Sequence, residues 1–122
     1  MSDNEVLDLD ILRPKRQIVK LGGKQIDVSI IPCGITFEVD QIVREFQTFS
    51  QAELEKGNGD QIRKALDLAI KLCATFAKVQ HEEMTEAWFR ANVDPFQIKK
   101  MAEVLQEALQ RSYAGVKEYG KN

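Results

Sequence analysis

The fold of this chain is decided by residues 18–32, which read IVKLGGKQIDVSIIP. Gly22 and Gly23 separate two runs in which apolar and polar side chains alternate. Glycine adopts positive φ without a Cβ clash, and the mirror-image turns of two-residue hairpins require positive φ. From Gln25 to Ile30 the alternation gives a strand with one apolar and one polar face. The stretch therefore predicts a β-hairpin that ends at Pro32.

The residues before the hairpin form two blocks of opposite charge. Residues 1–12 contain four acids and no base, and apolar residues alternate with the last two acids. Residues 13–24 contain five bases and no acid. Pro14 marks the boundary, because it has no backbone N–H and favours an extended residue before it. We predict an acidic arm over 1–12, either an edge strand or a loose arm, and a hairpin segment over 13–32.

The rest of the sequence follows helical periodicity. After a turn at Cys33 and Gly34, Thr36 is the expected N-cap of an amphipathic helix over about 37–54. A second helix over about 60–79 is apolar on more than one stripe. We therefore expect it to be the central helix and to pack on two sides.

Two further helices follow the central one. Thr85 is the expected cap of a short helix. Asp94 and Pro95 begin the last helix, since proline suits the first helical position. Gly115 and Gly120 weaken the end of this helix.

A chain of 122 residues has the length of one domain. We predict a single domain over 1–122 that belongs to the α+β class and is mainly α. An N-terminal β-hairpin is followed by a bundle of three long helices and one short helix. The hairpin packs against the bundle or projects from it. The helical body spans 36–113, and a polar tail spans 114–122.

The composition indicates a folded cytoplasmic protein. It is 43% hydrophobic and 30% charged, as is ordinary for a globular domain. The acidic N-terminus does not resemble a secretory signal, and no apolar run approaches the roughly 18 residues of a membrane span, so we expect no membrane contact. Cys33 and Cys73 are expected to be small buried side chains rather than a disulfide, since intracellular thiols stay reduced.

No group of residues in the sequence suits catalysis or metal binding. His81-Glu82 resembles the start of the zinc-protease helix motif, but Thr85 occupies the position of the second histidine. A zinc site from Cys33, Cys73 and His81 would lack the close ligand pairs of structural sites. The paired glycines lack the spacing of a phosphate-binding loop. We predict a protein that is not an enzyme, with no cofactor, metal or small-molecule substrate, and a solvated His81.

The basic hairpin segment allows three interpretations, which are contact with nucleic acid, contact with the acidic arm, and a solvated hairpin. A net charge of −2 gives no general attraction to phosphate, and no aromatic residue for base stacking lies within the segment, so we expect no nucleic-acid partner. Aromatic residues often anchor protein interfaces. The residues that we predict to face a protein partner are Ile18, Lys20, Phe37, Phe49, Trp88 and Tyr113.

The order of elements resembles the tail assembly chaperones of long-tailed bacteriophages and related prophages. The features that carry the resemblance are a basic strand, the sequence LGGK over 21–24, a strand ending at Pro32 and an all-helical remainder. The resemblance implies a non-enzymatic protein of the bacterial host cytoplasm that binds the tape measure protein and tail tube subunits. It also implies self-association into a homo-oligomer and absence from the finished virion.

Members of that family are often made in short and frameshifted long forms. The C-terminal Gly120, Lys121 and Asn122 are compatible with the codons GGA-AAA-AAC, which contain a slippery heptamer, although we favour the simpler interpretation of a frayed polar tail. The alternative function is that of a small cytoplasmic adaptor or regulatory protein that uses the same helical surface without any phage connection.

Overall fold

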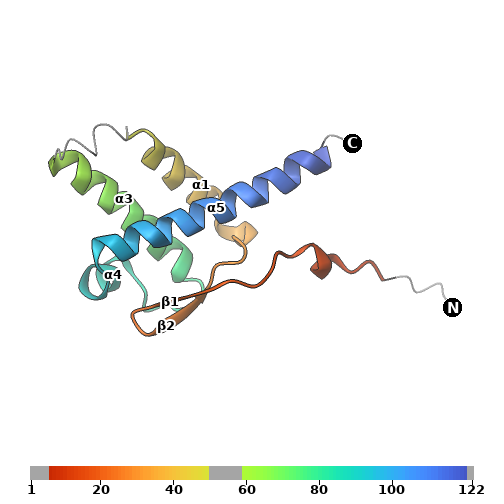
Figure 1. Cartoon of the computed structure of the whole chain (residues 1–122), viewed down its shortest axis with the longest axis horizontal. Coiled ribbons are helices and arrows are strands. Elements are labelled where there is room, and N and C mark those ends of the chain that lie inside the picture. Colours follow the sequence, from red (N-terminus) through yellow and green to blue (C-terminus); the bar gives the residue numbers. More distant parts are fainter. Residues whose placement is uncertain (1–5, 50–58, 121–122) are drawn as a thin grey trace.

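The structure is a computed structural model that describes residues 6–49 and 59–120 (Figure 1). It confirms a mainly α fold with a small β part, in which a two-stranded antiparallel hairpin precedes the helices. The elements are η1 (Leu9–Leu12), β1 (Ile18–Leu21), β2 (Lys24–Asp27), α1 (Cys33–Gln47), α3 (Gly59–Ala77), α4 (Glu86–Asn92) and α5 (Pro95–Gly120).

The hairpin has the turn that its glycines predict. Leu21 pairs with Lys24, so that the two glycines are the only loop residues, and their φ angles are 57° at Gly22 and 81° at Gly23. Leu21, Ile26 and Val28 are buried in the same core as the helices. Of the two predicted arrangements, the hairpin therefore packs against the helical body.

The second strand ends earlier than predicted, and the first helix begins earlier. The side chain of Asp27 accepts a hydrogen bond from the Ser29 amide, which turns the chain after β2. Pro32 then occupies the N-cap of α1, where its missing N–H costs nothing. The Thr36 hydroxyl donates to the Pro32 carbonyl at 2.9 Å, so the prediction that Thr36 caps the helix is wrong. α1 ends at Gln47, and the predicted extension over 50–54 lies outside the described residues.

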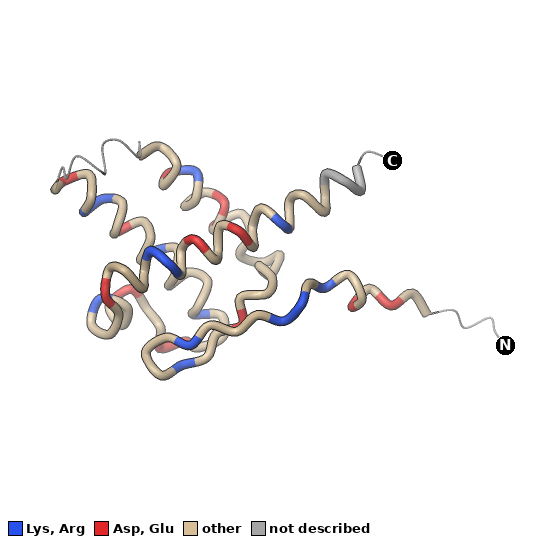
Figure 2. Tube along the Cα trace, in the orientation of Figure 1, with Lys and Arg blue, Asp and Glu red and all other residues tan. Residues whose placement is uncertain are grey.

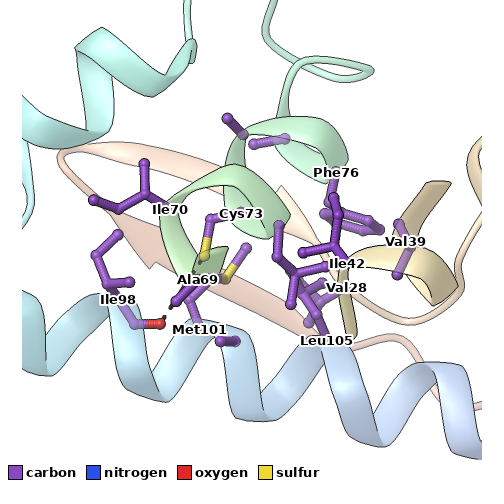
Figure 3. Packing of buried hydrophobic residues seen from close by; sticks show 14 of the residues in the cluster. Val28, Val39, Ile42, Ala69, Ile70, Cys73, Phe76, Ile98, Met101 and Leu105 are labelled. Carbon is purple, nitrogen blue, oxygen red and sulfur yellow. Dashed lines mark hydrogen bonds between the residues drawn. The ribbon is translucent and has the colours of Figure 1, made fainter. Parts of the chain in front are cut away.

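The core forms around α3, which packs against α1, α4 and α5. Figure 3 shows Phe76 of α3 reaching toward Val39 of α1, while Leu105 of α5 and Val28 of the hairpin lie in the same cluster. The two-sided packing predicted for the central helix is confirmed. Buried residues of the hairpin and of the three long helices therefore share one core.

The last two helices begin at the predicted caps. Thr85 accepts a hydrogen bond from the Trp88 amide at the start of α4. Asp94 and Gln97 exchange side-chain-to-backbone hydrogen bonds of 2.9 and 3.0 Å at the start of α5. α5 continues through Gly115 to Gly120, so residues 114–120 of the predicted tail extend the last helix. A glycine inside a helix lowers helix stability by only about 1 kcal/mol relative to alanine, so the helix continues through Gly115.

Candidate functional site

An apolar groove lies between α1, α3 and α5 and has a cavity volume of about 490 Å³. The lining positions on α3 and α5 recur at steps of three and four, so each of these helices contributes one face. The residues that line the groove are Phe46 from α1, Ile62, Ala65, Leu66 and Ala69 from α3, and Pro95, Ile98, Lys99, Ala102, Glu103 and Gln106 from α5.

Side-chain size explains why this groove is open. Ala65, Ala69 and Ala102 are nearly buried, and their short side chains leave the space between the helices unfilled. Ile62, in contrast, is 43% exposed on the α3 side. The groove therefore presents an apolar surface that another side chain can reach.

Among the described residues, the polar side chains that line the groove come from α5. They are Lys99, Glu103 and Gln106, and Glu103 also lies 3.5 Å from Lys100. The α1 and α3 sides contribute only apolar residues. An amphipathic helix matches such a lining, because it has both an apolar stripe and polar flanks.

The sequence did not single out these groove residues. The available signal was the wide apolar surface of α3, where the exposed Ile62 extends the apolar stripe beyond the residues that pack in the core. The sequence pattern does not distinguish a helix face that packs against a neighbouring helix from one that lines an open groove. That distinction depends on where α5 crosses α3.

The structure gives the six predicted partner residues different environments. Ile18 and Lys20 lie together on the outward face of β1 and are exposed, and Phe37 on α1 is 84% exposed. Phe49 is half-buried. None of the six lines the groove, and their role in partner binding stays a prediction.

Trp88 and Tyr113 make internal contacts. The Trp88 ring lies over Gly22 and contacts the ring of Phe89 edge-on, at a centroid distance of 5.1 Å. Tyr113 is half-buried against the core. Burial raises the pKa of the Tyr113 phenol, and the Asp40 carboxylate, which is also its hydrogen-bond partner, raises it further.

The residues after α3 cover the outer edge of β2. The Gln80 side-chain amide pairs with the backbone of Asp27, accepting from its N–H and donating to its carbonyl, both at 2.8 Å. His81 Nε2 lies 2.7 Å from the Gln25 carbonyl oxygen and donates to it, because a carbonyl only accepts. His81 is therefore a strand-edge contact rather than the solvated side chain that we predicted.

An ion pair reinforces this contact. Lys24 Nζ lies 2.6 Å from Glu83 Oε1, and this hydrogen bond holds the pKa of Glu83 below its ordinary value. Within the basic segment 13–24, Arg16 also has an acidic neighbour, since its Nε lies 3.8 Å from the Asp27 carboxylate. Figure 2 shows the other basic positions following the extended segment before β1 and the strand itself.

The Asp27 carboxylate should stabilise the fold in a pH-dependent manner. Hydrogen bonds from the hydroxyl and the amide of Ser29 hold the pKa of Asp27 below its usual 3.8, and the Arg16 charge contributes. A lowered folded-state pKa gives stability that is present above 3.8 and lost as the pH falls through the folded value. We expect the stability difference between the natural chain and Asp27→Asn to be constant above about pH 5 and to shrink below pH 3.8. Urea unfolding across this range measures the difference, and a pH-independent value would contradict the assignment.

The two cysteines are free. Burial raises the pKa of the Cys73 thiol to about 12, so that it stays protonated, and its sulfur lies 4.0 Å from the Ile98 carbonyl oxygen. Cys33 is exposed at the start of α1, which corrects the prediction that it is buried. Over 6–49 and 59–120, no group of three or more His, Cys, Asp or Glu side chains lies close enough to hold a metal ion.

A second cavity, of about 690 Å³, lies beside the acidic arm. Leu9 and Leu12 of the arm line one side of it, and Tyr113 and Val116 of α5 line another.

None of the described helices combines the length and the apolar character needed to cross a membrane. In comparisons with known proteins, no family model, curated protein or solved structure matches the chain.

Proposed function

We propose that this chain is a non-enzymatic binding protein that covers the apolar face of a partner helix. More specifically, we propose that it is a tail assembly chaperone of a long-tailed phage or prophage. Its clients would be the tape measure protein and tail tube subunits, which it would hold in the host cytoplasm before assembly. The observation that supports the proposal most is the open apolar groove between α1, α3 and α5.

The groove has the chemistry of helix recognition. A partner helix inserts apolar side chains spaced at i, i+3, i+4 and i+7 into a groove of this kind. Ala65, Ala69 and Ala102 allow such side chains to approach closely, and Lys99 and Glu103 lie where the polar flank of a partner would pass. The long helical segments expected in a tape measure protein have this pattern.

We expect Ile62→Asp to weaken client binding by at least about tenfold, which corresponds to about 1.4 kcal/mol. Ile62 is 43% exposed, so the substitution should leave the fold intact while placing a charge in the groove. Val79→Asp is the matched control, since Val79 is 56% exposed just beyond the end of α3 and does not line the groove.

The measurement is titration calorimetry against helical segments of the tape measure protein encoded beside this gene. Co-expression, with the soluble client measured, provides a second readout. Equal binding by the natural chain and Ile62→Asp would exclude the groove as the client site. An adaptor unrelated to phage would use the same groove, and the absence of a long helical tape measure frame downstream of the gene would favour it.

A further inference from the structure

The outer edge of β1 offers backbone hydrogen bonds that the described part of the chain does not use. In the hairpin register Val19 pairs with Ile26 and Leu21 with Lys24. Because the turn has two residues, these are the hydrogen-bonded pairs, and the N–H and C=O groups of Ile18 and Lys20 point outward. The corresponding edge of β2 is covered by Gln80 and His81, whereas no hydrogen bond is found to the β1 edge within 6–49 and 59–120.

The described part of the acidic arm, residues 6–12, exposes apolar side chains that a soluble protein normally buries. Each of them is 61–85% exposed, and they are Val6, Leu7, Leu9, Ile11 and Leu12. Figure 1 shows the arm extending away from the helical body. Leu9 and Leu12 line the second cavity with Tyr113 and Val116 of α5, but at this exposure α5 leaves most of the apolar surface of the arm uncovered.

The arm and the edge of β1 have opposite charges, and apolar and charged residues alternate in both sequences. The outward face of β1 carries Lys20, with Arg16 two residues before the strand, and the inward face carries Val19 and Leu21. On the arm, the acids at 8 and 10 alternate with the apolar residues at 7, 9 and 11. Since side chains alternate between the faces of a sheet, an antiparallel strand that places Leu9 and Leu7 beside Val19 and Leu21 places one acid beside Lys20 and the other beside Ile18, between the two bases.

The arm of the same copy is directed away from this edge. Gln17 accepts from the Val28 amide at 2.9 Å and donates its own amide to Ser29 Oγ at 2.7 Å, which keeps the chain extended beside β2. The backbone stays extended at Arg13, where ψ is 134°, before Pro14. Residues 9–12 then form η1, which Asp8 caps, so the arm of the same copy is not a strand here, and Figure 1 shows it running away from β1.

We propose that residues 6–12 of one copy, with the single turn of η1 unwound, add as a strand to the outer edge of β1 in a second copy, and that two copies exchange arms in this way. The resulting dimer would pair the backbone groups of Ile18 and Lys20 and cover the apolar side chains of both arms. None of the residues involved lines the groove, so the failure of dimerisation would not exclude client binding, and the failure of client binding would not exclude the dimer.

Charge reversal tests the exchange in full-length protein. One variant carries Asp8→Lys and Asp10→Lys, and the other carries Arg16→Glu and Lys20→Glu. Sedimentation equilibrium of the natural chain should give the mass of two copies. Either variant alone should dimerise at least tenfold more weakly. An equimolar mixture of the two variants should regain the dimer, because each arm then meets an edge of opposite charge. Glu107→Lys, on an exposed position of α5, is the control and should leave the dimer unchanged. A natural chain with the mass of one copy, or variants that dimerise normally, would overturn the proposal.

Amide exchange provides a readout that does not depend on the stability of the edge variant. In the natural chain, the amides of Ile18 and Lys20 should exchange at least tenfold more slowly than in the Asp8→Lys, Asp10→Lys chain. The amides of Val19 and Leu21 are paired inside the hairpin, so they should change little and serve as internal controls. Equal exchange of Ile18 and Lys20 in the two chains would exclude strand addition at this edge.

Discussion

Replacing Phe76 by alanine is expected to lower the free energy of unfolding by about 3–5 kcal/mol. Phe76 is 1% exposed and belongs to the cluster in which the hairpin, α1 and α5 meet α3 (Figure 3). Removing its ring leaves a cavity where these elements share one core. Since small domains have total stabilities of about 5–15 kcal/mol, the loss would be a large part of the whole.

Phe96→Ala is the matched control for this prediction. The same chemical change is made there, but Phe96 is 69% exposed in the first turn of α5. We expect a change within about 0.5 kcal/mol. Urea unfolding followed by circular dichroism measures both variants. Similar losses for the two substitutions would show that burial of Phe76 is not what stabilises the fold.

The second large effect is expected at the hairpin turn. Alanine at either Gly22 or Gly23 must adopt positive φ, which costs roughly 1–2 kcal/mol. A Cβ at Gly22 would in addition lie 2.6 Å from Trp88 Cη2, whereas a Cβ at Gly23 has no neighbour within 4 Å. Displacing a packed ring adds about 1–3 kcal/mol, so Gly22→Ala should destabilise the chain by about 2–5 kcal/mol and Gly23→Ala by about 1–2 kcal/mol.

A double-mutant cycle separates the contact from the backbone strain. In a Trp88→Leu background the ring is absent, so the extra cost of Gly22→Ala over Gly23→Ala should largely disappear. Thermal unfolding of the four single and double variants measures this difference. If the extra cost of Gly22→Ala persists without the ring, the contact with Trp88 is not its cause.

The elements that the sequence predicted correctly are those specified by neighbouring residues. Gly22 and Gly23 determine the hairpin turn through their own backbone freedom, and Thr85 caps α4 through a hydrogen bond three residues along. Asp94 with Gln97 does the same for α5. Such local signals do not depend on the rest of the fold, so the pattern of the sequence was enough.

The start of α1 shows where local signals mislead. Thr36 has the side chain of a cap, and Pro32 suggested the end of a strand. The bond from the Ser29 amide to Asp27 turns the chain earlier, so Pro32 becomes the N-cap and Thr36 lies inside the helix. The turn at Ser29 therefore determines where α1 begins, and the cap residues alone do not reveal it.

The candidate site depended on contacts between residues far apart in the sequence. His81 and Gln80 meet β2 across more than 50 residues, and the groove exists because α5 crosses α3 at their alanines. Neither the contact with β2 nor the groove leaves a recognisable pattern within a single segment of the sequence. The sequence could indicate that α3 has excess apolar surface, but not which part of it stays open.

The most direct test of the central claim is to map where a client helix binds. The probe is a tape measure segment with apolar residues at i, i+3, i+4 and i+7, added to isotope-labelled protein and followed by amide chemical shifts. We predict that the largest shifts lie at the groove residues of α3 and α5, among them Ile62, Leu66 and Lys99. Shifts confined to the hairpin or to α4, with these groove residues unchanged at saturation, would contradict the account.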